Sequence, residues 1–146
     1  MDTIKTLDAG AIVIKLSASN IEDSLDFYTG LFGWTVDDRY TLNAGGVYGT
    51  FSYVQLNPPG LRGNISFGLF KDIEAPLPAP DLNNPPPGTA PTFLVTDIAI
   101  TRAWLMECGI PVSDVVKNTS DEGYTDCFAF FADPDNNLLV IRENII

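Results

Sequence analysis

The 146-residue sequence contains no histidine and only two cysteines, and these absences remove several kinds of chemistry. Histidine is the usual partner of a nucleophilic serine or cysteine and a common ligand of transition metals, so sites built on it are excluded. Cys108 and Cys127 do not form the Cys-x-x-Cys spacing of zinc or redox motifs. Without a secretory signal, both cysteines are expected to be buried thiols.

Basic residues and long apolar runs are also scarce. Lys and Arg number 8 against 19 Asp and Glu, which gives a net charge of −11. The basic residues are scattered, so no patch suited to nucleic acid or to an anionic membrane surface is expected. No apolar run approaches the roughly 20 residues that span a bilayer, and residues 1–10 lack the pattern of a signal peptide. We therefore expect a cytoplasmic protein with no nucleic-acid or membrane partner.

What the chain does contain is material for one core and for an aromatic binding site. Hydrophobic residues make up 45% of the sequence, including nine Phe, five Tyr and two Trp. This length is typical of one domain. The order of the patterns divides that domain, residues 1–146, into a first module at about 9–72, a linker at 73–91 and a second module at about 92–146.

The first module starts with a strand whose residues alternate between two faces, one of them formed by Val13, Lys15 and Ser17. Asn20 is a helix cap, and Gly30 is the expected end of that helix. The strands expected in this module are 11–17, 35–42, 50–56 and 64–71.

The second module repeats the order of the first. Asp97 caps a helix that runs to Gly109. The strands expected in this module are 92–96, 112–118, 126–132 and 137–142. Such a repeat is a strong indication of two similar structural units.

The segment 73–91 between the modules is rich in proline, which excludes a helix or a central strand. We expect a stiff, extended linker, and a lid that folds over a binding site is the alternative.

Three motifs, in order, carry a resemblance to a known family: Ser24-Leu-Asp-Phe-Tyr-Thr-Gly-Leu-Phe-Gly-Trp34, Phe93-Leu-Val-Thr-Asp97 and Phe131-Ala-Asp-Pro-Asp-Asn-Asn137. The chain resembles the vicinal oxygen chelate superfamily, which includes glyoxalase I, extradiol dioxygenases and bleomycin-resistance proteins. The resemblance implies an α+β fold in which two tandem βαβββ modules form a curled mixed sheet around a cleft. Asn136 replaces the usual glycine of the last motif, and asparagine also tolerates a positive φ angle.

The resemblance also implies where metal ligands would lie. Those positions hold Val13, Ala90 and Val140, and the remaining one lies near Ser66 or Gly68. None of these side chains is a good ligand for a first-row metal. No carboxylate is expected inside a strand at a cleft-facing position, since Asp37, Asp38 and Asp126 lie near strand ends and Glu143 faces away from the cleft. We therefore expect no metal and no other cofactor.

Apolar and aromatic side chains are expected to line the cleft instead. Lys15 either reaches out to water or meets a ligand, and the face to which Phe51, Tyr53 and Gln55 belong is left open. The predicted ligand-binding residues are Val13, Lys15, Phe51, Tyr53, Ser66, Leu94, Phe128, Phe130 and Val140. Such a lining suits flat organic molecules.

The resulting hypothesis is a metal-independent protein that binds a small aromatic or apolar molecule, as bleomycin-resistance proteins sequester a drug. The alternative is a metal-free lyase, isomerase or cyclase, although no two acid–base residues are paired by their spacing. A third option is a role in protein–protein contact. The resemblance also implies a homodimer that shares its clefts.

Overall fold

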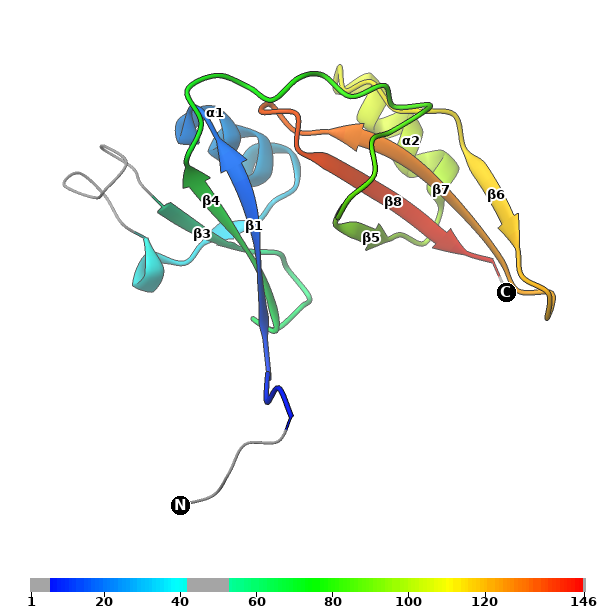
Figure 1. The fold of residues 1–146 in the computed structure, drawn as a ribbon, viewed down its shortest axis with the longest axis horizontal. Coiled ribbons are helices and arrows are strands. Elements are labelled where there is room, and N and C mark those ends of the chain that lie inside the picture. Colours follow the sequence, from blue (N-terminus) through cyan, green and yellow to red (C-terminus); the bar gives the residue numbers. More distant parts are fainter. Residues whose placement is uncertain (1–5, 42–52, 146) are drawn as a thin grey trace. The chain divides into compact units, whose positions relative to one another are not determined.

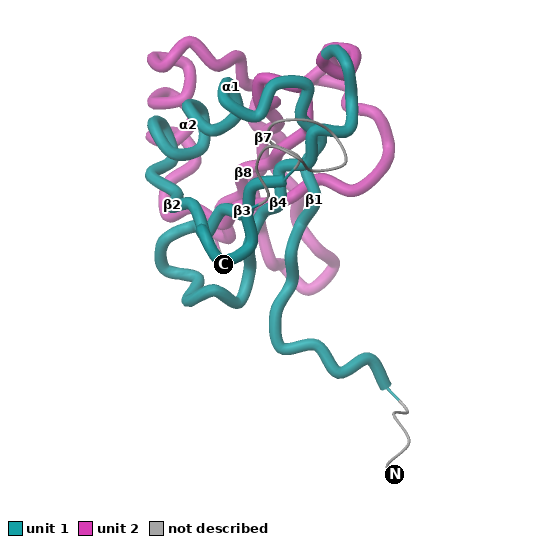
Figure 2. Tube along the Cα trace, turned by 90° about the vertical axis from the view of Figure 1, so that its left-hand side faces the viewer, with its two compact units in different colours: residues 1–75 teal, residues 76–146 magenta. Residues whose placement is uncertain are grey.

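Two four-stranded sheets organise the chain in the computed structural model, which describes residues 6–41 and 53–145. Each sheet belongs to one of two compact units, unit 1 at Met1–Ala75 and unit 2 at Pro76–Ile146 (Figures 1 and 2). Each unit carries its own strands and helix, and each is described separately below.

Unit 1 has the strand order β1-β4-β3-β2, in which β1 and β4 run parallel and the other neighbours run antiparallel. Its elements are β1 (Ile12–Ala18), α1 (Ile21–Leu25), the π-helix η1 (Asp26–Leu31), β2 (Thr35–Val36), the 3-10 helix η2 (Asp38–Tyr40), β3 (Tyr53–Asn57) and β4 (Ile65–Lys71).

Unit 2 repeats this topology with the strand order β5-β8-β7-β6. Strands β5 and β8 are parallel, and the remaining pairs are antiparallel. Its elements are β5 (Thr92–Leu94), α2 (Ile98–Glu107), β6 (Val116–Thr119), β7 (Thr125–Ala132) and β8 (Leu138–Asn144). The predicted α+β fold of two βαβββ modules is confirmed.

Both predicted helix caps are present. The side chain of Asn20 accepts a hydrogen bond from the Asp23 amide at 3.3 Å, and Asp97 accepts one from the Ile100 amide at 3.0 Å. Glu143 also caps α2, because its Oε1 accepts from the Ile98 amide at 2.8 Å. This contact places Glu143 on the helix side of β8, as the alternation along that strand predicts.

The first helix changes type along its length, which the sequence pattern did not predict. After one turn of α1 the chain continues as the π-helix η1 and ends at Leu31, one residue beyond Gly30. A π-helix places residues five positions apart on one face. It therefore brings the rings of Phe27 and Phe32 to 4.9 Å, beside the buried Tyr28.

Three strands are shorter than predicted. The predicted strand 92–96 ends at Leu94, and the other two are shortened where side chains bind the backbone locally. The predicted strand 35–42 keeps only Thr35–Val36, since Asp37 accepts from the Arg39 amide at 3.2 Å and caps η2. The predicted strand 112–118 begins only at Val116. Before it, the Ser113 amide still donates to the Phe130 carbonyl at 2.9 Å, but the Phe130 amide donates to the Ser113 hydroxyl at 2.8 Å instead of to a backbone carbonyl.

From residue 76 onwards, the proline-rich segment is hydrogen-bonded to the rest of unit 2. The Leu77 amide donates to the Asp135 carbonyl at 3.0 Å, and Asn136 Nδ2 donates to the Leu77 carbonyl at 2.7 Å. Farther along, the Asp114 amide donates to Asn83 Oδ1 at 2.9 Å. These bonds hold the extended segment against its own unit.

In each unit the core lies between the helix and the sheet. The largest fully buried side chains of the two cores are Tyr28, Leu56, Phe67 and Leu69 in unit 1 and Leu105, Phe131 and Leu139 in unit 2. Cys127 is buried as expected, but Cys108 is exposed because it ends α2 on the surface. Across the described ranges 6–41 and 53–145, the helices are too short to cross a bilayer.

Candidate functional site

The face of each sheet that points away from the helix carries the predicted ligand-binding residues that belong to the described ranges. Cα partners in adjacent strands share a face, and Val13 pairs with Ser66 while Lys15 pairs with Gly68. Gln55 also pairs with Gly68, so β3 presents Tyr53 and Gln55 on this same face. The register thus answers the question that the sequence left open for β3. Phe51 lies outside the described residues.

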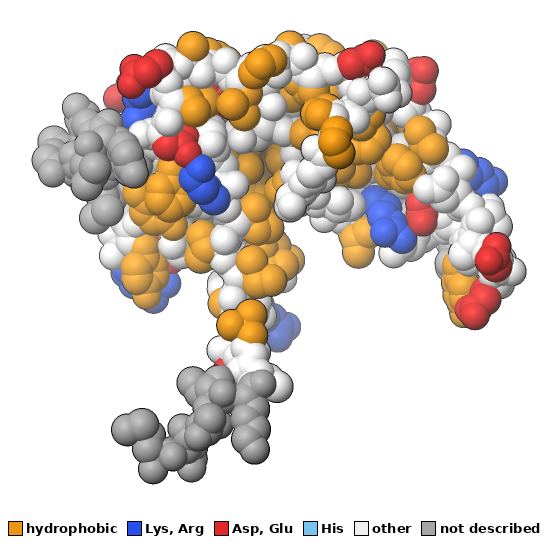
Figure 3. Space-filling view, viewed as in Figure 1, with side chains coloured by type: hydrophobic (Ala, Val, Ile, Leu, Met, Phe, Trp, Pro, Cys, Tyr) orange, Lys and Arg blue, Asp and Glu red, His pale blue; other side chains and the backbone are white. Residues whose placement is uncertain are grey.

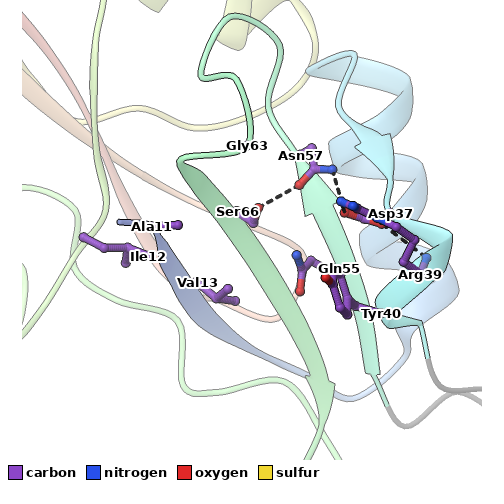
Figure 4. A pocket seen from close by; sticks show the side chains of 10 residues that line it. All are labelled: Ala11, Ile12, Val13, Asp37, Arg39, Tyr40, Gln55, Asn57, Gly63 and Ser66. Atoms are coloured by element: carbon purple, nitrogen blue, oxygen red, sulfur yellow. Dashed lines mark hydrogen bonds and ion pairs between the residues drawn. The ribbon is translucent and has the colours of Figure 1, made fainter. Parts of the chain in front are cut away.

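Unit 1 has a pocket of about 390 Å³ on this face (Figure 4). It contains two of the predicted residues, Val13 and Ser66, together with Gln55, which lies on the same face of the sheet. The lining residues are Ala11, Ile12, Val13, Asp37, Arg39, Tyr40, Gln55, Asn57, Gly63 and Ser66. Ala11, Ile12 and Val13 form an apolar wall. The polar side chains of Asp37, Gln55, Asn57 and Ser66 form what we call the floor.

A chain of hydrogen bonds fixes part of that floor. Ser66 Oγ donates to Asn57 Oδ1 at 2.7 Å, and Asn57 Nδ2 donates to Asp37 Oδ2 at 3.1 Å. Arg39 donates to both carboxylate oxygens of Asp37, at 2.9 and 2.8 Å. The bonds from Arg39 and then Asn57 hold the pKa of Asp37 well below its usual range. Asp37 therefore stays ionised in a paired state.

The ring of Tyr53 lies over Gly68 on the adjacent strand β4, which is possible because glycine has no side chain. A Cβ atom at Gly68 would come within 2.5 Å of the Tyr53 ring, which occupies that space. From there Tyr53 Oη donates to Gln55 Oε1 at 2.7 Å. Partial burial, and then the charge of Asp37, raise the pKa of Tyr53. Its hydroxyl remains protonated at neutral pH and can donate to Gln55.

Unit 2 has a second pocket, of about 320 Å³, on the equivalent face of its own sheet. It brings together three predicted residues, Phe128, Phe130 and Val140. The rings of Phe128 and Phe130 meet edge to face with their centroids 5.6 Å apart. The lining residues are Gly88, Ala90, Thr92, Asn118, Asp126, Phe128, Phe130, Val140 and Arg142.

The expectation that no carboxylate faces these surfaces from within a strand was wrong. Asp126 belongs to β7, lines the pocket of unit 2 and pairs with Arg142 Nη2 at 3.1 Å. The alternation of Asp126 with Phe128 and Phe130 was the signal that could have placed it there. Asp37 lines the pocket of unit 1 from the turn that shortens β2.

Lys15, Tyr53 and Leu94 do not line either pocket. Lys15 Nζ forms an ion pair with Asp72 and lies 5.8 Å from the centroid of the Phe70 ring, and its side chain is 56% exposed. Leu94 shares the face of its Cα partner Arg142 but is 67% exposed. Lys15 thus has a partner within unit 1 that sequence reasoning did not identify.

The positions implied as metal ligands fall into the two pockets, Val13 and Ser66 in one and Ala90 and Val140 in the other. Three of these side chains are hydrocarbon, and the Ser66 hydroxyl already donates to Asn57. This donor set does not fit a divalent metal. Within the described part of the chain, no three Cys, Asp or Glu side chains come close enough to hold an ion.

Comparisons with known proteins identify the family and the fold of the chain. The sequence model of the Glyoxalase/Bleomycin resistance protein/Dioxygenase superfamily matches residues 11–141. Among solved structures, TnmS3, an antibiotic binding protein from Streptomyces sp. CB03234, is 23% identical, with 97% of this chain and 99% of that chain covered and a TM-score of 0.62.

Two further structures show the same fold. A glyoxalase/bleomycin resistance protein from Streptomyces sp. CB03234 is 25% identical, with 88% of this chain and 96% of that chain covered and a TM-score of 0.55. The glyoxalase family protein from Enterococcus faecalis is 21% identical, with 96% and 100% covered and a TM-score of 0.62. No match is found among curated proteins.

Proposed function

Since the chain belongs to the glyoxalase/bleomycin resistance protein/dioxygenase superfamily, we propose that it binds a small, flat organic molecule without a metal and sequesters it. The observation that carries this proposal is the chemistry of the two pockets. Hydrocarbon side chains stand where the family resemblance implies metal ligands, and Phe128 and Phe130 stand beside Val140. A solved structure with this fold is an antibiotic binding protein, which supports a drug or metabolite as the ligand.

The protonation states of the titratable residues in and beside the pockets favour binding over catalysis. A general acid or base works best when its pKa lies near the working pH. The pKa of Asp37 is lowered and that of Tyr53 is raised, so both move away from neutrality. Asp126 is held in an ion pair with Arg142. The alternative of a metal-free lyase, isomerase or cyclase therefore has less support from these residues.

Phe130 is expected to contact the ring of a bound molecule. A thermal-shift panel of flat aromatic compounds should yield a ligand, and Phe130→Ala should weaken its binding by about 1–3 kcal/mol through lost stacking and apolar contact. Isothermal titration calorimetry on the best compound measures the change. Lys15→Met should have a smaller effect than Phe130→Ala, because Asp72 already compensates the lysine charge.

Tyr124 provides the matched control for Phe130. It is an exposed aromatic residue in the turn before β7, outside both pockets, so Tyr124→Ala should leave affinity unchanged. If Phe130→Ala binds the compound as tightly as Tyr124→Ala does, the pocket of unit 2 is not part of the binding site.

We further propose that the protein is a homodimer. In their sheets β1 and β5 are edge strands, and hydrophobic side chains are exposed along β1, where Ile12 is 59% accessible (Figure 3). Exposed edge strands with apolar residues are natural sites of association. Light scattering at micromolar concentration should give twice the mass of the 15.9 kDa chain. A monomer mass would contradict the dimer and leave the binding proposal standing.

A further inference from the structure

The side chain of Gln55 is a buried polar group in the pocket of unit 1 whose hydrogen bonding is incomplete. Residue Gln55 is only 9% exposed, and its Oε1 accepts from Tyr53 Oη at 2.7 Å. Among the described residues, its carboxamide nitrogen donates no hydrogen bond. A buried donor without a partner is costly, so the amide is suited to an acceptor that the protein itself does not supply.

The neighbouring acceptors in the pocket are already engaged with donors of their own. Asn57 Oδ1 accepts from Ser66, and both oxygens of Asp37 accept from Arg39. None of these bonds involves the Gln55 amide. The two N–H groups of Gln55 are therefore buried donors that are left for a bound molecule.

The amide is also held in a fixed orientation. Tyr53 lies over Gly68, and its hydroxyl binds the oxygen of the carboxamide, which leaves the nitrogen at the opposite end. Figure 4 shows Gln55 between Val13 and Tyr40. Both of these side chains are large and half exposed. They provide apolar surfaces for a flat ring whose edge reaches Gln55.

We propose that unit 1 selects flat ring systems that carry an acceptor oxygen, such as a ring carbonyl, at one edge, and that the Gln55 amide donates to this oxygen. The inference rests on the proposed function and adds to it the chemical class of the ligand. The pocket, at about 390 Å³, suits a molecule of two or three fused rings.

The test compares pairs of compounds that differ in one carbonyl group. The probes are 9-fluorenone with fluorene and xanthone with xanthene, and equilibrium dialysis gives the dissociation constant of each. The quantity of interest is the preference for the ketone over its hydrocarbon partner. From wild type to Gln55→Met this preference should fall about tenfold, the factor expected for one hydrogen bond to a buried donor.

Tyr53→Phe separates the amide from its orientation. It removes the same bond between Tyr53 and Gln55 that Gln55→Met removes but keeps the N–H groups, so it should lower the ketone preference by less than Gln55→Met does. Gln55→Glu is a second variant, because its carboxylate can still accept from Tyr53 but lacks the N–H groups. It too should lose the ketone preference. Circular dichroism establishes that each variant is folded.

The outcomes separate this inference from the proposed function. If ketones and hydrocarbons both bind and Gln55→Met and Gln55→Glu keep the wild-type preference, the role of Gln55 is refuted and the binding function stands. If none of the four probes and no compound of the wider aromatic panel binds the wild-type protein, both proposals fail.

Discussion

Trp34→Ala is expected to lower the free energy of unfolding of unit 1 by about 3–5 kcal/mol, the range for removing a large aromatic side chain from a core. The Trp34 ring stacks against Tyr28 at 4.7 Å and against Phe67 at 4.6 Å. All three residues are buried. The loss of one ring therefore leaves a cavity in the middle of an aromatic stack that joins the helix to β4. Urea denaturation followed by circular dichroism measures the change.

Trp104 is the control, because it is the second of the two tryptophans and is 39% exposed on α2. Trp104→Ala should cost less than about 1.5 kcal/mol, as is usual for partly exposed side chains. Each variant retains one tryptophan. Fluorescence therefore reports on unit 2 in Trp34→Ala and on unit 1 in Trp104→Ala. Equal losses of stability in the two variants would contradict the central place of Trp34 in the core of unit 1.

Asp133→Ala is expected to cost about 3 kcal/mol, because the buried carboxylate organises the turn between β7 and β8. Asp133 Oδ1 accepts from the amides of Asp135 and Asn137, at 3.0 and 2.8 Å, and Oδ2 accepts from Asn137 Nδ2 at 2.8 Å. Asn136 completes the turn with a φ of 65°. The motif therefore has a structural role, and several bonds are lost together when the side chain is removed.

Asp133→Asn keeps the shape of the side chain and one oxygen acceptor, so it should cost less than Asp133→Ala. Thermal unfolding of both variants gives the comparison, and the affinity for the compound identified by the panel is measured in parallel. Unchanged melting of Asp133→Ala together with weaker ligand binding would mean that the turn belongs to the binding site instead of the scaffold.

The two pockets show how one repeated module can carry two different chemistries. The pocket of unit 1 has a hydrogen-bonded floor of Asp37, Asn57 and Ser66, whereas that of unit 2 presents the paired rings of Phe128 and Phe130. Both occupy the helix-free face of a sheet with the same strand order. The shared backbone fixes where a pocket forms, and the side chains set its chemistry.

The sequence alone predicted the repeat, both helix caps and the faces of the first and last strands. These features depend on neighbours in the chain or on a period of two, as with the cap at Asp97 and the alternation of Val13 with the core residues. Residue type alone argues against a metal site. The sequence has no histidine, and the hydrocarbon side chains of Val13 and Val140 offer no atom that could bind a metal.

Only the tertiary structure decided which polar groups meet. Lys15 pairs with Asp72 after a separation of 57 residues, and Arg142 on β8 reaches Asp126 on the adjacent strand β7. The oxygen of Gln55 meets the hydroxyl of Tyr53, whose ring has room only because Gly68 has no side chain. A periodic pattern assigns a residue to a face, but partners on that face are set by strand order and register, which depend on contacts distant in sequence.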